Sequence, residues 1–173
     1  LVFDTHDRLI ACEKGRLTRV EPDSSRTVLV TCDGWANDLS LASDGGIFFT
    51  QPTWSVPESS YVYYMAPGGQ RSTLRSQAPG FPNGIEYVEE RDLLYVAYSQ
   101  SNVVKAFTLD DSNDIVDSIE FATISTPDGF ALDEYGNLWL TSNSRARVEV
   151  YDPSGTELGR IQVTGQSNIQ NCA

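Results

Sequence analysis

The sequence predicts an all-β fold of the propeller class, in which about four blades each consist of four antiparallel strands. Three observations lead to this prediction. Short runs rich in Val, Ile, Leu, Tyr and Phe alternate with turns rich in Gly, Asp, Asn and Pro along the whole chain. A motif recurs at a spacing of 43 to 46 residues, the length expected of a propeller blade. No stretch has the periodicity of an amphipathic helix of useful length.

The recurring motif is an Asx residue followed by a small or polar residue and then an apolar run. Its four copies open at Asn37, Asn83, Asp128 and Asn171, and after each of the first three a turn leads into a second apolar run. The stretch that begins at Leu1 reads as an earlier copy that has lost its opening Asx, with apolar runs at residues 1–3 and 9–11. We therefore predict one domain, residues 1–173, with repeats at approximately 1–36, 37–82, 83–127 and 128–170.

Two further β runs complete the four strands of each repeat. They are residues 16–20 and 27–30, 61–65 and 72–74, 103–108 and 115–121, and 148–151 and 159–163. The connections between them contain Gly, Asp, Asn and Pro in combinations that are typical of hairpin turns. Since propellers contain from about 4 to 8 blades, the repeats fit either a closed four-bladed ring or an open arc of a six-bladed one.

The charge of the chain restricts its partners. The 173 residues include 12 Lys and Arg against 24 Asp and Glu, which gives a formal net charge of −12. Such a chain repels phosphate backbones and anionic lipids, so we expect no nucleic acid and no membrane as partner. No apolar run approaches the ~18 residues of a membrane span, and the sequence shows no signal peptide. Three dispersed cysteines without a CxxC pair leave the compartment undetermined, with a slight preference for the cytoplasm.

The opening Asx residues are the candidate functional residues. In a propeller the first strand of each blade lines the central channel, so Asn37, Asn83, Asp128 and Asn171 are expected to converge despite their separation in sequence. Their amide and carboxylate oxygens are ligands that Ca²⁺ and Mg²⁺ prefer. The alternative is turn chemistry, in which an Asx side chain bonds the local backbone. The sequence leaves these two interpretations evenly balanced.

Two motifs one blade apart, Phe81-Pro82-Asn83-Gly84-Ile85 and Thr126-Pro127-Asp128-Gly129-Phe130, are more specific than single blade motifs. With them, the sequence resembles the SMP-30/gluconolactonase/luciferin-regenerating-enzyme-like family of six-bladed propellers over essentially its whole length. The resemblance implies hydrolysis of a sugar lactone or related cyclic ester at a divalent metal ion, Ca²⁺ first, with Zn²⁺, Mg²⁺ and Mn²⁺ as alternatives. It implies that Asn83 and Asp128 bind the metal and that Asn37 contacts substrate or metal-bound water. A carboxylate at the metal can also help to deprotonate water, and Asp128 is the candidate for this catalytic role.

The chain departs from the family pattern at several positions. In the family a Glu of the first blade completes the metal ligands, and the resemblance places it N-terminal to the residues of this chain. Glu13 lies in a different strand and is not assigned this role. Gly34-Trp35-Ala36 lacks the Arg and the Asn-Ser-Pro that many members carry before Asn37, and Gln51 replaces a common Asp. We therefore expect weak metal binding and poor catalysis from this polypeptide alone, and keep a non-catalytic propeller module that binds a small ligand or a protein as the alternative function.

Two further expectations follow from the predicted loops and blade ends. Trp35 and Trp54 lie in loops on either side of the first hairpin of their blade, so both are considered for contact with a small-molecule lactone. Trp35, two residues from Asn37, is the candidate chosen. An open arc would expose apolar faces and unpaired strand edges at its two ends, which favour association. Unless the ring closes on itself, we therefore expect a homo-oligomer joined at these ends.

Overall fold

The computed structural model describes residues 1–75 and 80–172 of the chain. Their regular structure consists of β-strands and three 3-10 helices, η1 (Pro57–Ser59), η2 (Glu89–Arg91) and η3 (Asn143–Arg145). None of the helices in this part of the chain has the length and apolar character needed to cross a membrane.

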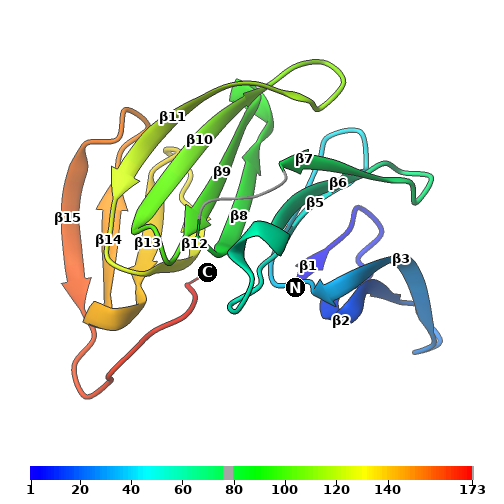
Figure 1. Ribbon diagram of the computed structural model, residues 1–173, viewed down its shortest axis with the longest axis horizontal. Helices are drawn as coiled ribbons and strands as arrows, with labels where there is room; N and C mark the ends of the chain where they lie inside the picture. The colour runs from blue at the N-terminus through cyan, green and yellow to red at the C-terminus, as the bar shows by residue number, and fades with distance from the viewer. Residues whose placement is uncertain (76–79, 173) are drawn as a thin grey trace.

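The strands form four antiparallel sheets, and within each sheet consecutive strands pair with one another (Figure 1). The first sheet contains β1 (Val2–Phe3), β2 (Leu9–Val20) and β3 (Arg26–Trp35). The second contains β4 (Leu39–Leu41), β5 (Ile47–Gln51), β6 (Tyr61–Met65) and β7 (Arg71–Arg75). The third contains β8 (Pro82–Val88), β9 (Leu93–Tyr98), β10 (Val103–Leu109) and β11 (Ile115–Thr123). The fourth contains β12 (Pro127–Leu132), β13 (Leu138–Ser142), β14 (Arg147–Tyr151) and β15 (Glu157–Gln162).

The first strands of the sheets lie on the inside of the molecule. Contacts run from β1 to β4, from β4 to β8 and from β8 to β12, and the outer strands fan away from this line (Figure 1). In the described part of the chain the four sheets form an open arc and not a closed four-bladed ring. The prediction of an all-β propeller architecture is thus confirmed, and the structure decides between the two arrangements that the repeats allowed.

Hydrophobic clusters lie between neighbouring sheets. Because side chains alternate along a strand, successive residues of one strand pack into different clusters. In β9, Leu94, Val96 and Tyr98 pack between the second and third sheets. The intervening residues Tyr95 and Ala97 pack between the third and fourth sheets. Successive side chains of a strand point to opposite faces, so a strand that is covered on both faces is apolar throughout. The continuous apolar runs of the sequence have this cause.

The first sheet has three strands where the sequence predicted four. The runs expected as separate strands at residues 9–11 and 16–20 belong to one continuous strand, β2. Its first part pairs with β1 and its second part with β3, and the register shifts between Lys14 and Arg16. Gly15, with φ of +77°, takes up this irregularity. The two predicted runs are therefore parts of one strand with an irregularity between them.

Candidate functional site

The two motifs singled out in the sequence begin β8 and β12 with the same irregularity. Pro82-Asn83-Gly84 and Pro127-Asp128-Gly129 stand at the first positions of these strands. In each strand the pairing with the following strand breaks after the proline and resumes three residues later, at Ile85 in β8 and at Phe130 in β12. Such a break works like a β-bulge, which redirects the side chains of the residues that it leaves unpaired.

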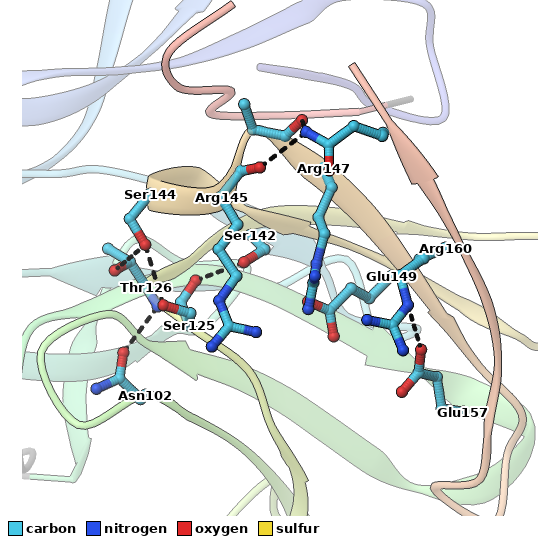
Figure 2. Close-up of polar contacts among 12 residues, drawn as sticks. Asn102, Ser125, Thr126, Ser142, Ser144, Arg145, Arg147, Glu149, Glu157 and Arg160 are labelled. Carbon is cyan, nitrogen blue, oxygen red and sulfur yellow. Dashed lines mark hydrogen bonds and ion pairs between the residues drawn. The ribbon is translucent and has the colours of Figure 1, made fainter. Parts of the chain in front are cut away.

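The residue before each proline adopts a left-handed backbone conformation. The φ angle is 60° at Phe81 and 47° at Thr126, a region in which bulky or branched side chains are strained. Hydrogen bonds hold Thr126 there, since its N–H donates to Oδ1 of Asn102 at 2.8 Å and its hydroxyl to Oγ of Ser144 at 3.0 Å (Figure 2). Strain of this kind concentrates at functional sites, so these two equivalent positions mark this end of the sheets as a candidate site.

Glycine follows each of these Asx residues because neighbouring blades approach closely here. A Cβ atom on Gly84 would clash with the carbonyl oxygen of Asp128, and one on Gly129 would clash with the side chain of Asn171. The N–H of Gly129 also donates to the carbonyl of Gln170 at 2.7 Å. The Asx-Gly pairs of successive repeats are therefore stacked against one another, which only glycine allows at this separation.

A cavity of about 360 Å³ brings Asn37, Asn83 and Asp128 together at this end of the sheets. The other residues that line it are Trp54, Phe81, Ser99, Thr126, Asn143, Asn168 and Gln170. Asp128 is the single ionisable side chain among these lining residues, and amides and hydroxyls form most of the remaining polar surface. The fourth opening Asx residue, Asn171, lines a different cavity along the inner strands.

Asp128 is partly buried at the start of β12. Its Oδ2 accepts a hydrogen bond from Nδ2 of Asn143 at 3.0 Å. Burial raises the pKa of the Asp128 carboxyl and the negative charge of Asp38 acts in the same direction, while hydrogen bonds from Asn143 and Asn83 oppose them. Because the net direction is upward, Asp128 is a stronger base than an exposed aspartate would be.

Asn83 is fixed by a network that crosses three sheets. Its side chain is buried, and its Nδ2 donates to Oγ of Ser99 at 3.1 Å. Ser99 in turn donates to the carbonyl of Pro127 at 2.5 Å, and the hydroxyl of Thr50 donates to the carbonyl of Asn83 at 2.7 Å. Because Thr50 lies in β5, Asn83 in β8 and Pro127 in β12, these bonds hold the starts of the inner strands at fixed positions.

The two tryptophans considered in the sequence have different environments. Trp35 is the last residue of β3 and does not line the cavity; the Lys14 ammonium lies 5.6 Å from its ring centroid. Trp54 lines the cavity, and its ring centroid lies 3.9 Å from that of Phe81. Asn37, between β3 and β4, donates its N–H to the carbonyl of Thr50 at 2.9 Å. The geometry therefore gives support to Trp54 as a contact residue and none to Trp35.

The donor atoms of the cavity suit a hard cation. Asp128 offers carboxylate oxygens, Asn83 and Asn37 offer amide oxygens, and no His or Cys is among the residues that line the cavity. Such a set fits Ca²⁺ or Mg²⁺ better than Zn²⁺. Within residues 1–75 and 80–172, no group of three His, Cys, Asp or Glu side chains is arranged to hold a metal ion. The cavity thus contributes one carboxylate and several neutral oxygens.

Asn143 and Ser99 belong to the site but were not predicted from the sequence. Ser99 follows the last residue of β9, and Asn143 follows the last residue of β13. They occupy equivalent positions in consecutive sheets, and each contacts an opening Asx residue. An alignment of the second strands of the repeats would have placed these two polar residues at the same end as the Asx residues.

The four sheets form an arc, and a polar cavity lies where their inner strands begin. This arrangement is that of a propeller protein whose site is formed by residues of successive blades. The whole chain, residues 1–173, matches the family described as SMP-30/Gluconolactonase/LRE-like region. The chain therefore belongs to this family, as the motifs at Asn83 and Asp128 indicated.

Relatives of known identity are similar over much of this chain. The pentonolactonase XacC of Haloferax volcanii is 26% identical over 158 residues, which are 87% of this chain and 54% of the relative. A lactonase drp35 of Staphylococcus aureus is 26% identical over 137 residues, 75% of this chain and 42% of the relative. The chain thus spans about half the length of the curated relatives that it matches.

Solved structures are also similar over nearly the whole of this chain and over less than two thirds of their own length. A gluconolactonase from Xanthomonas campestris superposes with a TM-score of 0.83 at 28% identity, over 99% of this chain and 63% of that one. The calcium-binding protein regucalcin from Agrobacterium tumefaciens gives a TM-score of 0.83 at 17% identity, over 99% of this chain and 61% of that one. At that identity regucalcin supports the shared fold alone.

Proposed function

We propose that this protein hydrolyses a sugar lactone or a related cyclic ester, with a divalent metal ion bound in the cavity formed by Asn37, Asn83 and Asp128. The observation that carries the proposal is the convergence of these three residues, each from a different repeat, on one polar cavity. The names of the similar proteins, which include lactonases and a gluconolactonase, support the same reaction class.

Asn83 and Asp128 would hold the metal through their side-chain oxygens, and Ca²⁺ fits this donor set best. The cation, when bound, supplies Lewis-acid polarisation of the lactone carbonyl and stabilises the negative charge that develops on its oxygen. With a single carboxylate lining the cavity, we expect weak Ca²⁺ binding, and a calorimetric titration that gives micromolar or tighter affinity would contradict this expectation.

The residues of the chain supply the proton chemistry and the orientation. Asp128, whose pKa is raised chiefly by burial, accepts the proton of the attacking water as general base. Asn143 holds the Asp128 carboxylate in one orientation by its 3.0 Å hydrogen bond. Asn37 offers an amide to the lactone carbonyl or to a ring hydroxyl, so that the reacting carbon is kept near the water.

The test compares lactone hydrolysis by the unchanged protein and by Asp128→Ala, each with Ca²⁺, Mg²⁺, Mn²⁺ or Zn²⁺ and with a chelator. Removal of the general base and metal ligand is expected to lower kcat/KM by a factor of about 100 or more. Asp111→Ala, which removes an exposed carboxylate in the turn between β10 and β11, is the matched control and should leave the rate unchanged. Equal rates for the Asp128 variant and the unchanged protein would reject the catalytic proposal and favour a non-catalytic binding module.

A further inference from the structure

Part of the wall of the cavity that holds Asn37, Asn83 and Asp128 is formed by aromatic side chains. Trp54 and Phe81 both line the cavity, with ring centroids 3.9 Å apart and ring planes inclined by 35°. Phe81 is buried, whereas Trp54 leaves 66% of its surface exposed. Phe81 thus packs against the indole of Trp54, and most of the surface of Trp54, which lines the cavity, stays exposed.

The exposure of Trp54 is not explained by folding. Burial of apolar surface is what an indole contributes to stability, and a ring that is two-thirds exposed contributes little of it. The other large exposed side chains lie elsewhere, whereas Trp54 lies at the one cavity that also holds Asn37, Asn83 and Asp128. An open aromatic surface beside convergent polar groups is the arrangement of a ligand site.

The loop that carries Trp54 is held in place. The N–H of Thr53 donates to Oγ of Ser60 at 2.8 Å, and the hydroxyl of Thr53 donates to the carbonyl of Ser59 at 3.2 Å. Ser60 itself is fully buried, directly before the first residue of β6. Because these bonds close the loop at its base, Trp54 is oriented before a ligand arrives, which lowers the entropic cost of binding.

We propose that Trp54 is a specificity-determining residue that stacks on the apolar C–H face of a ring lactone while the Asx residues bind its polar edge. The proposal rests on the proposed lactonase function and adds the residue that recognises the apolar face of the lactone ring. Sugar lactones of this kind carry hydroxyls at the rim and C–H bonds on the ring faces, so they match a cavity with one aromatic wall and amide-lined polar walls. The cavity volume of about 360 Å³ accommodates a single ring of this size.

The experiment measures binding and hydrolysis separately. Binding is measured by calorimetry with a sugar lactam, which keeps the ring and the hydroxyls but replaces the scissile ester with an amide. Hydrolysis of the corresponding lactone gives kcat and KM. Both are measured for the unchanged protein, Trp54→Ala, Trp54→Phe and Trp35→Ala. The control is Tyr135→Ala, which removes an exposed aromatic ring from the turn between β12 and β13.

For Trp54→Ala we expect a loss of about tenfold in lactam affinity and a similar rise in KM, with kcat nearly unchanged. Trp54→Phe should restore most of the affinity, and Tyr135→Ala should bind as the unchanged protein does. Unaltered lactam affinity and KM in Trp54→Ala, with hydrolysis intact, would overturn the proposal for Trp54 and leave the lactonase function standing. A larger loss in Trp35→Ala than in Trp54→Ala would assign the aromatic contact to Trp35 instead. Absence of both lactam binding and hydrolysis in the unchanged protein would reject the two proposals together.

Discussion

Substitution of Asn143 tests whether the orientation of the Asp128 carboxylate matters for metal binding and hydrolysis. Its side chain donates to Asp128 at 3.0 Å and lines the same cavity. We expect Asn143→Ala to weaken Ca²⁺ binding and to lower kcat/KM by about tenfold each, since partners that orient a ligating carboxylate typically have effects of this size. Asn143→Asp replaces the Asn143 donor with a second negative charge, which should raise the pKa of Asp128 further in the absence of metal. Calorimetric titration and lactone kinetics measure both, and unchanged affinity in Asn143→Ala would rule out the positioning role.

The sequence allowed the residues that meet at the site to be predicted, but not the backbone conformation that positions them. The convergence of Asn37, Asn83 and Asp128 follows from their position at equal points of successive repeats. The left-handed conformation of Phe81 and Thr126 could not be predicted, because residues before proline avoid the right-handed helical region but rarely adopt positive φ. At Thr126 it is held by hydrogen bonds to Asn102 and Ser144, which lie in other segments of the chain.

Strand β9 is buried on both faces, and this burial allows the loss of stability in a core variant to be predicted. Val96 is fully buried in the core between the second and third sheets. Val96→Ala should lower the free energy of unfolding by about 2 kcal/mol, since it removes two methyl groups and leaves a cavity that the rigid sheets cannot close. Val116→Ala in β11 is the matched control, because Val116 is 61% exposed and its change should stay within about 0.5 kcal/mol. Urea unfolding of the two variants measures the difference, and equal losses would contradict this account of the core.

The strands themselves were largely predictable, because apolar runs bounded by turn residues fix both their position and their length. The exception is β2, where residues 9–11 and 16–20 were predicted as separate strands and the four residues between them as a connection. No Pro, Asn or Asp stands in that segment, and Gly15 with φ of +77° serves a bulge there and not a turn. A single glycine is compatible with a turn and with a bulge. The pairing of β2 with β3 shows that it is a bulge, and this pairing cannot be read from the local sequence.

For the molecule as a whole, we propose that copies of this chain associate through the end sheets of the arc. Exposed apolar side chains lie on the first sheet, at Phe3 and Val28, and on the last, at Leu158 and Ile161. Light scattering should give about twice the 19.1 kDa of the chain, because apolar surface and strand edges at both ends favour association. The double substitution Leu158→Lys and Ile161→Lys should shift the mass toward that of the monomer. A monodisperse monomer of the unchanged protein would contradict the proposal.

The inner face of the arc makes the stability of the whole molecule depend on pH. Glu86 of β8 and Asp38 line a cavity of about 430 Å³ along the inner strands, together with Cys172. Burial, with the negative charge of Asp38, raises the pKa of Glu86 to about 7, whereas an unfolded chain has a value near ~4.3. The folded protein therefore binds this proton more tightly, and the contribution of Glu86 to stability is most favourable below pH ~4.3 and is lost as the pH rises to about 7.

We expect the free energy of unfolding to fall by up to about 3 kcal/mol between pH 5 and pH 7.5 because of this group. Asp4 and Asp133, whose pKa values are lowered to about 2, change their charge well below this interval and leave the slope unaffected. Urea unfolding in chelator-containing buffers across the interval measures the slope, and Glu86→Gln should flatten it because the amide stays neutral throughout. A slope that persists in Glu86→Gln would show that another group on the inner face, with Asp38 the first candidate, carries the pH dependence.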